Sequence, residues 1–154
     1  MANTIMHFEI PADDVQRAKT FYEKTFGWKI TQYPMPAGQE YWGVATRKDG
    51  EQGINGGLMQ RKMPGQSFTN YVTVKSIDPM IAAVQANGAS IILPKQAIAG
   101  GMGWIAVFKD PENNVIGLHQ AGPQAARPRA AAKKSAKRTT KRAAKKPSRS
   151  RKRR

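Results

Sequence analysis

A histidine and a glutamate near the start of this sequence have the types and the spacing that chemistry requires. His7 and Glu9 lie two apart in the alternating stretch "IMHFEI", so in a β-strand their side chains point to the same side. A carboxylate beside an imidazole can polarise it, and the pair could then act as a base or hydrogen-bond a ligand. The alternative is a polar sheet surface that does no chemistry.

The second histidine lies in a segment that repeats an earlier one. "GLHQ" begins at Gly117 and echoes "GLMQ", which begins at Gly57. His119 follows Gly117 by two residues and would face the same side of a strand. If these strands meet in the fold, His7, Glu9 and His119 form a two-histidine, one-carboxylate set, which is typical of non-haem iron sites.

The echo belongs to a duplication that covers most of the chain. Residues 4–62 predict a strand, an amphipathic helix and three further strands, and residues 69–120 predict the same order. The helix boundaries recur as well, with Asp13 or Asp14 as the first N-cap, Asp78 as the second, and Gly27 and Gly88 as C-terminal stops. The sequence therefore predicts an α+β fold built from two tandem βαβββ modules.

Charge divides the chain into two parts. Residues 121–154 hold 15 Lys and Arg and no acidic residue, which leaves 11 basic residues against 10 acidic ones before them. The basic part has no aromatic and no branched aliphatic residue, so it cannot bury enough apolar surface to offset its ordering entropy. We expect a domain over residues 1–122 that folds by itself, and a disordered tail over residues 123–154.

The tail resembles those of linker histones and of bacterial histone-like proteins. Such a segment neutralises phosphates, releases counterions and binds polyanions with little sequence preference. The alternative is a solvated tail that only keeps the protein in solution. The candidate nucleic-acid contacts are Lys133, Lys134, Lys137, Arg138, Lys141, Arg142, Lys145, Lys146, Arg149, Arg151, Lys152, Arg153 and Arg154.

The composition also excludes some classes of site. The chain has no cysteine, so it has neither disulfides nor thiolate metal sites. The N-terminal stretch lacks the basic and apolar regions of a signal peptide, and no segment approaches the roughly 20 apolar residues that span a bilayer. We expect a cytoplasmic protein without a membrane partner, which the tail could bring to the nucleoid.

Three segments together resemble one known superfamily. They are "MHFEIPADDVQRAKTFYEKTFGW", "YVTVKSID…ANGA" and "FKDPENNVIGLHQ", and the resemblance covers about residues 4–120. The chain is similar to the vicinal oxygen chelate superfamily, which includes glyoxalase I, bleomycin-resistance proteins and extradiol dioxygenases. The resemblance implies a cup-shaped mixed sheet, a homodimer and, where members are enzymes, lyase, isomerase or dioxygenase reactions.

The resemblance also implies where a metal ion would bind. Metalloenzymes of this superfamily take their ligands from the first and last strand of each module. The corresponding positions here are His7, Gly57, Tyr71 and Gly117. His7 alone matches a ligand, and catalytic sites normally need about three protein ligands. We therefore expect no cofactor, with the triad of His7, Glu9 and His119 as the alternative that would hold a divalent ion.

Glycine at two of these positions predicts extra room in the cup for an organic ligand. The candidate pocket residues are Gly57, Met59, Thr73, Gly117, Trp42 and Trp104, although core packing is the alternative for at least one tryptophan. The candidates for acid–base or ligand-orienting roles are His7, Glu9, Tyr71 and His119.

Three functions remain open from the sequence. The first is a glyoxalase-like or bleomycin-resistance-like protein whose cup binds a small organic molecule at a degenerate metal site. The second is a non-catalytic module that sequesters a drug or metabolite. The third is a nucleic-acid-associated protein that binds through its basic tail.

Overall fold

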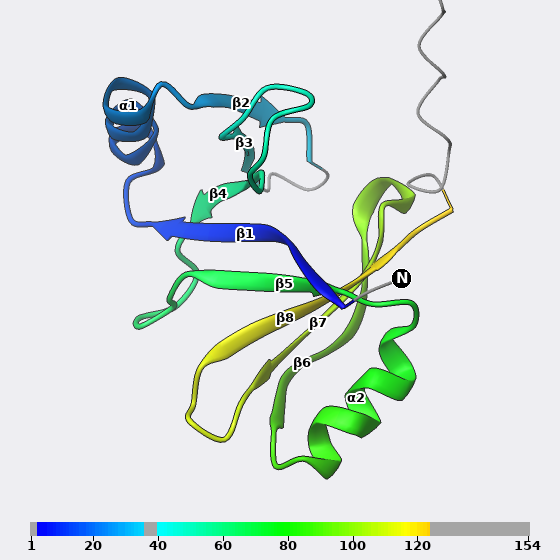
Figure 1. Cartoon of the computed structure of the whole chain (residues 1–154). Helices are drawn as coiled ribbons and strands as arrows, with labels where there is room; N and C mark the ends of the chain where they lie inside the picture. Colours follow the sequence, from blue (N-terminus) through cyan, green and yellow to red (C-terminus); the bar gives the residue numbers. More distant parts are fainter. Residues whose placement is uncertain (1–2, 36–39, 124–154) are drawn as a thin grey trace, which may run out of the picture.

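The two halves of the chain fold alike in the computed structural model, which describes residues 3–35 and 40–123 (Figure 1). The first half consists of β1 (Thr4–Ala12), α1 (Val15–Phe26), β2 (Lys29–Tyr33), β3 (Tyr41–Ala45) and β4 (Gly56–Gln60). The second half consists of β5 (Thr69–Thr73), α2 (Ile77–Ala86), β6 (Ser90–Ile98), η2 (Ala99–Gly101), β7 (Gly103–Lys109) and β8 (Val115–Ala121). The predicted βαβββ order is confirmed in each half.

All eight strands form one mixed, open sheet with the order β2-β3-β4-β1-β5-β8-β7-β6. The first strand of each half pairs in parallel with the last strand of the same half, β1 with β4 and β5 with β8. The halves join through the antiparallel pair of β1 and β5. The strand order is thus symmetric about this central pair, which confirms the predicted α+β fold.

The first helix begins at one of the two predicted N-caps, Asp14, and ends at the predicted Gly27. The Asp14 side chain accepts a hydrogen bond from the Arg17 N–H at 2.9 Å, and Gly27 ends the helix in the left-handed conformation with φ of 67°. Glycine suits that conformation because it has no Cβ to clash with the backbone.

The start of the second helix differs from the prediction. The N-cap of α2 is Ser76, and Asp78 lies in the first turn, where it pairs with Lys95 at 2.5 Å. The prediction of Asp78 as N-cap is wrong because strand β8 supplies the acceptor. The Gln120 side chain accepts a hydrogen bond from the Ile77 N–H at 2.9 Å. A partner 43 positions along the chain therefore sets this helix boundary.

The glutamine that ends each copy of the echo ties a last strand to the helix of its own module. Gln60 donates from Nε2 to the Asp13 carbonyl at 3.0 Å, and Gln120 accepts from the Ile77 N–H at 2.9 Å. Asp13 and Ile77 occupy equivalent positions in the duplication. The echo therefore preserves a structural contact between strand and helix.

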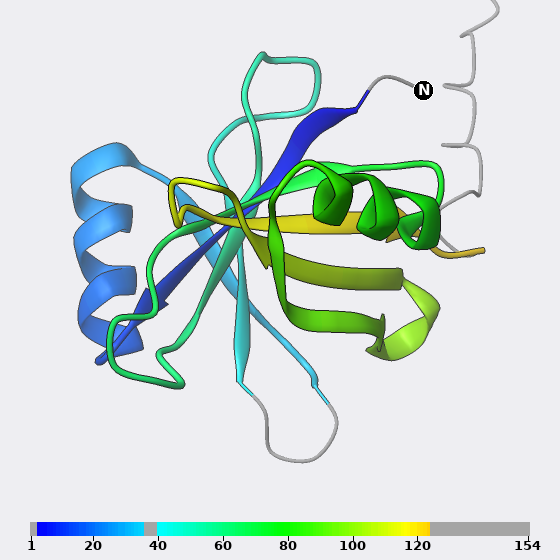
Figure 2. The ribbon, with the colours of Figure 1, turned by 90° about the horizontal axis from the view of Figure 1, so that it is seen from below.

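Each helix covers one half of the same face of the sheet, so the molecule has two cores (Figure 2). Leu58 in the first core and Ile77 in the second are both 0% exposed. Trp42 lies in the first core, and Trp104 packs against the second. The prediction that these tryptophans line the pocket is wrong, because side-chain alternation along β3 and β7 turns both toward the helices.

No helix among residues 3–35 and 40–123 has the length and apolarity to cross a membrane.

Candidate functional site

The face of the sheet opposite the helices carries the residues that the sequence singled out. Paired residues in a sheet point to the same side. His7 pairs with Tyr71, which in turn pairs with Gly117, while Glu9 pairs with Gly57 and Thr73 pairs with His119. The four central strands therefore bring together eight predicted residues: His7, Glu9, Gly57, Met59, Tyr71, Thr73, Gly117 and His119.

A shift in register places His7 on this face. Ile5 pairs with Val72, which packs against the second core, and the register then shifts so that His7 pairs with Tyr71. Uninterrupted alternation would turn His7 toward the helices together with Ile5. The irregularity at Met6 is thus what delivers the imidazole to the concave side.

Two hydrogen bonds connect the centre of this face. Nε2 of His7 lies 2.8 Å from the hydroxyl of Tyr41, and the hydroxyl of Tyr71 donates to Oε2 of Glu9 at 2.7 Å. The Glu9 carboxylate also lies beside Tyr41, whose phenol it influences electrostatically. An imidazole, a carboxylate and two phenols therefore form one continuous polar cluster.

Tyr41 is the member of this cluster that the sequence prediction missed. The strand was recognised, but only Trp42 within it was considered. Period-two alternation from Trp42 places Tyr41 and Gly43 on the face opposite the core. Tyr41 pairs with Met59 and Tyr33, and its ring reaches the diagonal Gly57. An aromatic residue diagonal to a glycine is therefore the signal that could have identified it.

The two glycines at the expected ligand positions lie beneath tyrosine rings. A Cβ at Gly117 would come closer than 3.0 Å to Cγ, Cδ1 and Cε1 of Tyr71, so this ring lies across the glycine. A Cβ at Gly57 would come equally close to Oη and Cζ of Tyr41. The expectation that glycine enlarges the cavity is therefore wrong, because the rings fill the space that the missing side chains leave.

Burial shifts the pKa values of the cluster toward its neutral forms. The pKa of His7 is lowered by desolvation and then by the charge of His119, and burial also lowers the pKa of His119. Desolvation raises the pKa of Glu9, against the opposing hydrogen bond from Tyr71. The pKa values of Tyr41 and Tyr71 rise because of burial and the nearby Glu9 charge, so both phenols remain protonated donors at neutral pH.

These residues do not fit a catalytic divalent ion. Within residues 3–35 and 40–123, no group of three or more His, Cys, Asp and Glu side chains is placed to hold a metal. The three residues of the predicted triad are not grouped around one point, because Nε2 of His7 is engaged by Tyr41 and His119 pairs with Thr73. The Tyr41 and Tyr71 rings occupy the space at Gly57 and Gly117, so a carboxylate ligand at either position would require a ring to move.

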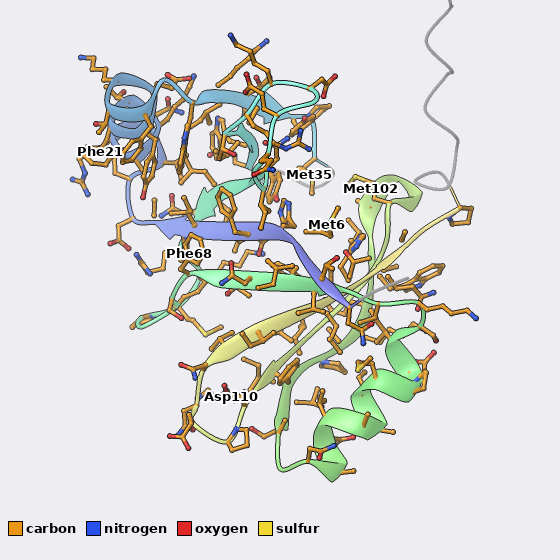
Figure 3. All side chains as sticks on the ribbon, in the orientation of Figure 1. Met6, Phe21, Met35, Phe68, Met102 and Asp110 are labelled. Carbon is orange, nitrogen blue, oxygen red and sulfur yellow. The ribbon has the colours of Figure 1, made fainter. Side chains whose placement is uncertain are left out.

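Methionines contribute apolar surface near this polar floor. Met6 is 60% exposed and Met102 is 48% exposed. Met6 directly precedes His7 in β1, and the Met102 backbone is hydrogen-bonded to the His119 side chain (both methionines are labelled in Figure 3). Methionine adapts its shape to varied ligands, because its side chain is unbranched and polarisable. The concave face thus combines the polar cluster at its centre with methionine side chains that can adapt to a ligand.

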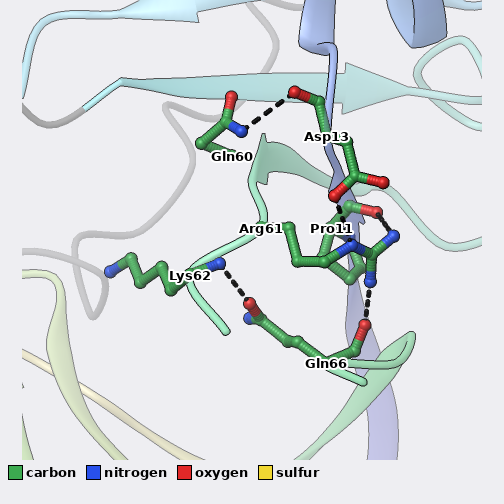
Figure 4. Close-up of polar contacts among 6 residues, drawn as sticks. All are labelled: Pro11, Asp13, Gln60, Arg61, Lys62 and Gln66. Carbon is green, nitrogen blue, oxygen red and sulfur yellow. Dashed lines mark hydrogen bonds and ion pairs between the residues drawn. The ribbon is translucent and has the colours of Figure 1, made fainter. Parts of the chain in front are cut away.

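A hollow of about 500 Å³ is lined by Asp13, Arg61, Lys62, Met63, Pro64 and Gly65. None of these residues belongs to the cluster, although the Lys62 charge lowers the pKa of Glu9 against the effect of burial. The Arg61 guanidinium beside the hollow donates to Oδ1 of Asp13 at 2.8 Å and to the carbonyls of Pro11 and Gln66 (Figure 4). All three guanidinium nitrogens are bonded within the protein, so this network fastens the loop after β4 to the end of β1.

Comparisons with known proteins agree with this architecture. Residues 4–46 match the family described as bleomycin resistance protein-like N-terminal. A putative glyoxylase, CFP32 of Mycobacterium tuberculosis, is 26% identical over 122 residues, which are 73% of this chain and 44% of that protein. The match thus spans less than half of the length of that relative.

Two further matches cover almost the whole of the proteins compared. A glyoxylase-like domain-containing protein of Didymella fabae is 30% identical over 116 residues, 71% of this chain and 88% of the relative. A crystal structure of a glyoxalase/bleomycin resistance protein/dioxygenase superfamily member from Vibrio splendidus has a TM-score of 0.55 at 18% identity. The aligned region covers 78% of this chain and 99% of the Vibrio splendidus chain.

The contact between Tyr71 and Gly117 leads to a double-mutant prediction. Gly117→Ala should lower the free energy of unfolding by about 1–3 kcal/mol, because the new methyl group overlaps the Tyr71 ring. The same substitution should cost less in a Tyr71→Ala background, with a coupling of about 0.5–3 kcal/mol. Denaturant unfolding of the four proteins measures this coupling, and equal costs in both backgrounds would show that the ring does not fill the space.

The raised pKa of Glu9 leads to a pH prediction. The native state binds the proton of the Glu9 carboxyl more tightly than the unfolded chain does. The protonated carboxyl therefore contributes its full stabilisation below pH 4.5, and this contribution is lost as the pH rises through the native pKa of Glu9. Glu9→Gln removes the titration, so its unfolding free energy relative to wild type should rise from acidic to neutral pH. Denaturant unfolding at several pH values measures the difference. Glu112→Gln, which removes an exposed turn carboxylate, is the control, and a pH-independent difference for Glu9→Gln would contradict the prediction.

Proposed function

Because the chain belongs to the glyoxalase/bleomycin resistance/dioxygenase superfamily, we propose that its concave face binds a small organic molecule without a divalent metal ion. The observation that carries the proposal is the central cluster, where phenols occupy the space of the expected metal ligands. The His7–Tyr41 and Tyr71–Glu9 hydrogen bonds hold neutral donors and one carboxylate acceptor on the floor of the cup.

The cluster supports recognition by hydrogen bonds rather than by chelation. Tyr41, Glu9, His7 and His119 are each partly exposed, so a bound molecule can reach them, whereas Tyr71 is 6% exposed and supports Glu9 from within. Adaptable methionines beside this floor suit the apolar part of an organic ligand. Small-molecule sites commonly combine apolar walls with a few placed polar groups.

Acid–base chemistry at this site would depend on Glu9. A carboxylate with a raised pKa is a stronger proton acceptor than an exposed one, and the Tyr71 hydroxyl remains as a donor to it. The neutral imidazoles of His7 and His119 can accept or donate a proton nearby. In this proposal Glu9 is the proton acceptor, and Tyr71 is the residue that positions it.

Binding in the presence of a chelator tests the proposal. Full-length protein, treated with nuclease and washed at high salt, should hold far less than one Zn²⁺ or Co²⁺ per chain after dialysis. Ligand-observed NMR with a library of small organic molecules in EDTA should find compounds whose binding is weakened by Glu9→Gln and unaffected by Glu112→Gln.

Two results would contradict it. One is an ion bound near one equivalent per chain and lost in His7→Ala, and the other is ligand binding that EDTA abolishes. For a compound that binds, turnover indicates an enzyme, whereas tight binding without turnover indicates a sequestering protein.

We also propose a second function, nucleic-acid binding, for the basic tail. The observation that favours it is the charge division, with 15 Lys and Arg and no acid in residues 121–154. The thirteen candidate contacts between Lys133 and Arg154 lie outside the described residues. Closely spaced cations bind phosphate backbones mainly by releasing counterions, so such binding carries little sequence preference.

Deletion of residues 123–154 tests the tail. Full-length protein should remain on immobilised double-stranded DNA at about 0.15 M salt and dissociate steeply as salt rises, whereas the 1–122 fragment should not be retained. Circular dichroism confirms that the fragment is folded. Equal retention of both proteins would show that the tail is not the binding segment.

A further inference from the structure

The hydroxyl of Tyr41 lies where three side-chain positions of the concave face converge. Nε2 of His7 lies 2.8 Å from it, and the Glu9 carboxylate lies beside it. The third position is Gly57, whose Cβ direction runs into the Tyr41 Oη and Cζ atoms. An imidazole nitrogen, a carboxylate and the direction of a potential third side chain therefore surround one oxygen atom.

Such a set of donors around a central atom is what a divalent transition metal requires. Imidazole nitrogen together with carboxylate oxygen suits zinc, cobalt and nickel, and about three protein donors make a stable site. Here the neutral phenol of Tyr41 lies at the central position and is hydrogen-bonded to Nε2 of His7, the nitrogen that would otherwise bind the metal ion. The phenol ring also covers Gly57 and leaves no space for a third donor.

We propose that Tyr41 excludes divalent metal ions from this face. Its hydroxyl fills the would-be coordination centre between His7 and Glu9, and its ring takes the space that a ligand side chain at position 57 would need. The inference rests on the proposed metal-independent binding and names the residue responsible for it. Tyr41 is therefore a specificity-determining residue, because it decides that the face recognises ligands by hydrogen bonds.

Simple packing of an aromatic ring over glycine is the competing explanation, and the structure contains a control for it. Tyr33 lies over Gly43 on the same face, where a Cβ at Gly43 would approach three Tyr33 ring atoms. No hydrogen bond joins Tyr33 to a histidine among the described residues. The same pair of substitutions at Tyr33 and Gly43 opens equivalent space without uncovering the His7 nitrogen.

Metal titration of full-length variants, freed of polyanions by nuclease and high salt, tests the proposal. Tyr41→Ala/Gly57→Glu should bind about one Co²⁺ per chain, at least about tenfold more tightly than wild type. Adding His7→Ala should abolish that binding. Gly57→Glu alone and the control Tyr33→Ala/Gly43→Glu should behave like wild type, whereas Tyr41→Ala alone, which frees His7 but adds no third donor, should bind Co²⁺ more weakly than the double variant.

Three outcomes would overturn it. They are binding by Gly57→Glu with Tyr41 in place, equal binding by the Tyr33→Ala/Gly43→Glu control, and a folded double variant that binds no better than wild type. Circular dichroism establishes folding in each case.

A conservative variant tests the proposal even if the double variant does not fold. Tyr41→Phe keeps the ring and removes only the hydroxyl that engages His7. Titrated Ni²⁺ should then broaden the His7 imidazole resonances in Tyr41→Phe at lower concentration than in wild type, while the His119 resonances respond alike in both. An unchanged His7 response would overturn the inference. Ligand binding by wild type in EDTA does not depend on these variants, so failure of the inference is distinct from failure of the proposed function.

Discussion

The antiparallel pairing of β1 with β5 is the contact on which the rest of the structure depends. It joins two modules that each form a four-stranded sheet and one helix-covered core. It also sets His7 opposite Tyr71, and through the neighbouring parallel pairs it places Gly57 and Gly117 at either side. A one-residue slip in a strand exchanges its two faces. The register shift after Ile5 therefore decides the position of His7, because it turns the imidazole out of the core.

Tyrosine packed on glycine is the second constraint on this face. Each glycine lets a ring from elsewhere in the sheet lie against the backbone, and the ring regains the packing that a side chain would have supplied. Tyr71 lies over Gly117 in this way, and Tyr41 lies over Gly57. The phenol hydroxyls then point toward Glu9 and His7, where they satisfy partly buried polar groups that would otherwise be costly. Packing and polar satisfaction thus depend on the same two rings.

Local patterns in the sequence predicted the elements, and long-range contacts decided where the prediction failed. The duplication, the shared face of His7 and Glu9 and the Asp14 and Gly27 helix boundaries follow from spacing of a few residues, whereas the register shift between Ile5 and His7 does not. Asp78 failed as a cap because Gln120, distant in sequence, binds the start of that helix. The expected cavity at Gly57 failed for the same reason, since the ring that fills it comes from another strand. A glycine in the sequence shows where a side chain is absent, but it does not show which other residue fills that space.

A neutral phenol and a metal ion would give this face different chemistry. An ion attracts any ligand with two adjacent oxygens and lowers the pKa of whatever it binds. A protonated phenol is directional and has no net charge, so it leaves the carboxylate of Glu9 with its raised pKa and the imidazole of His7 neutral. Such a face discriminates by the placement of donors and acceptors, and mismatched ligands leave buried polar groups unpaired. In the proposed site, Tyr41 therefore gives shape-dependent hydrogen bonding in place of general oxygen chelation.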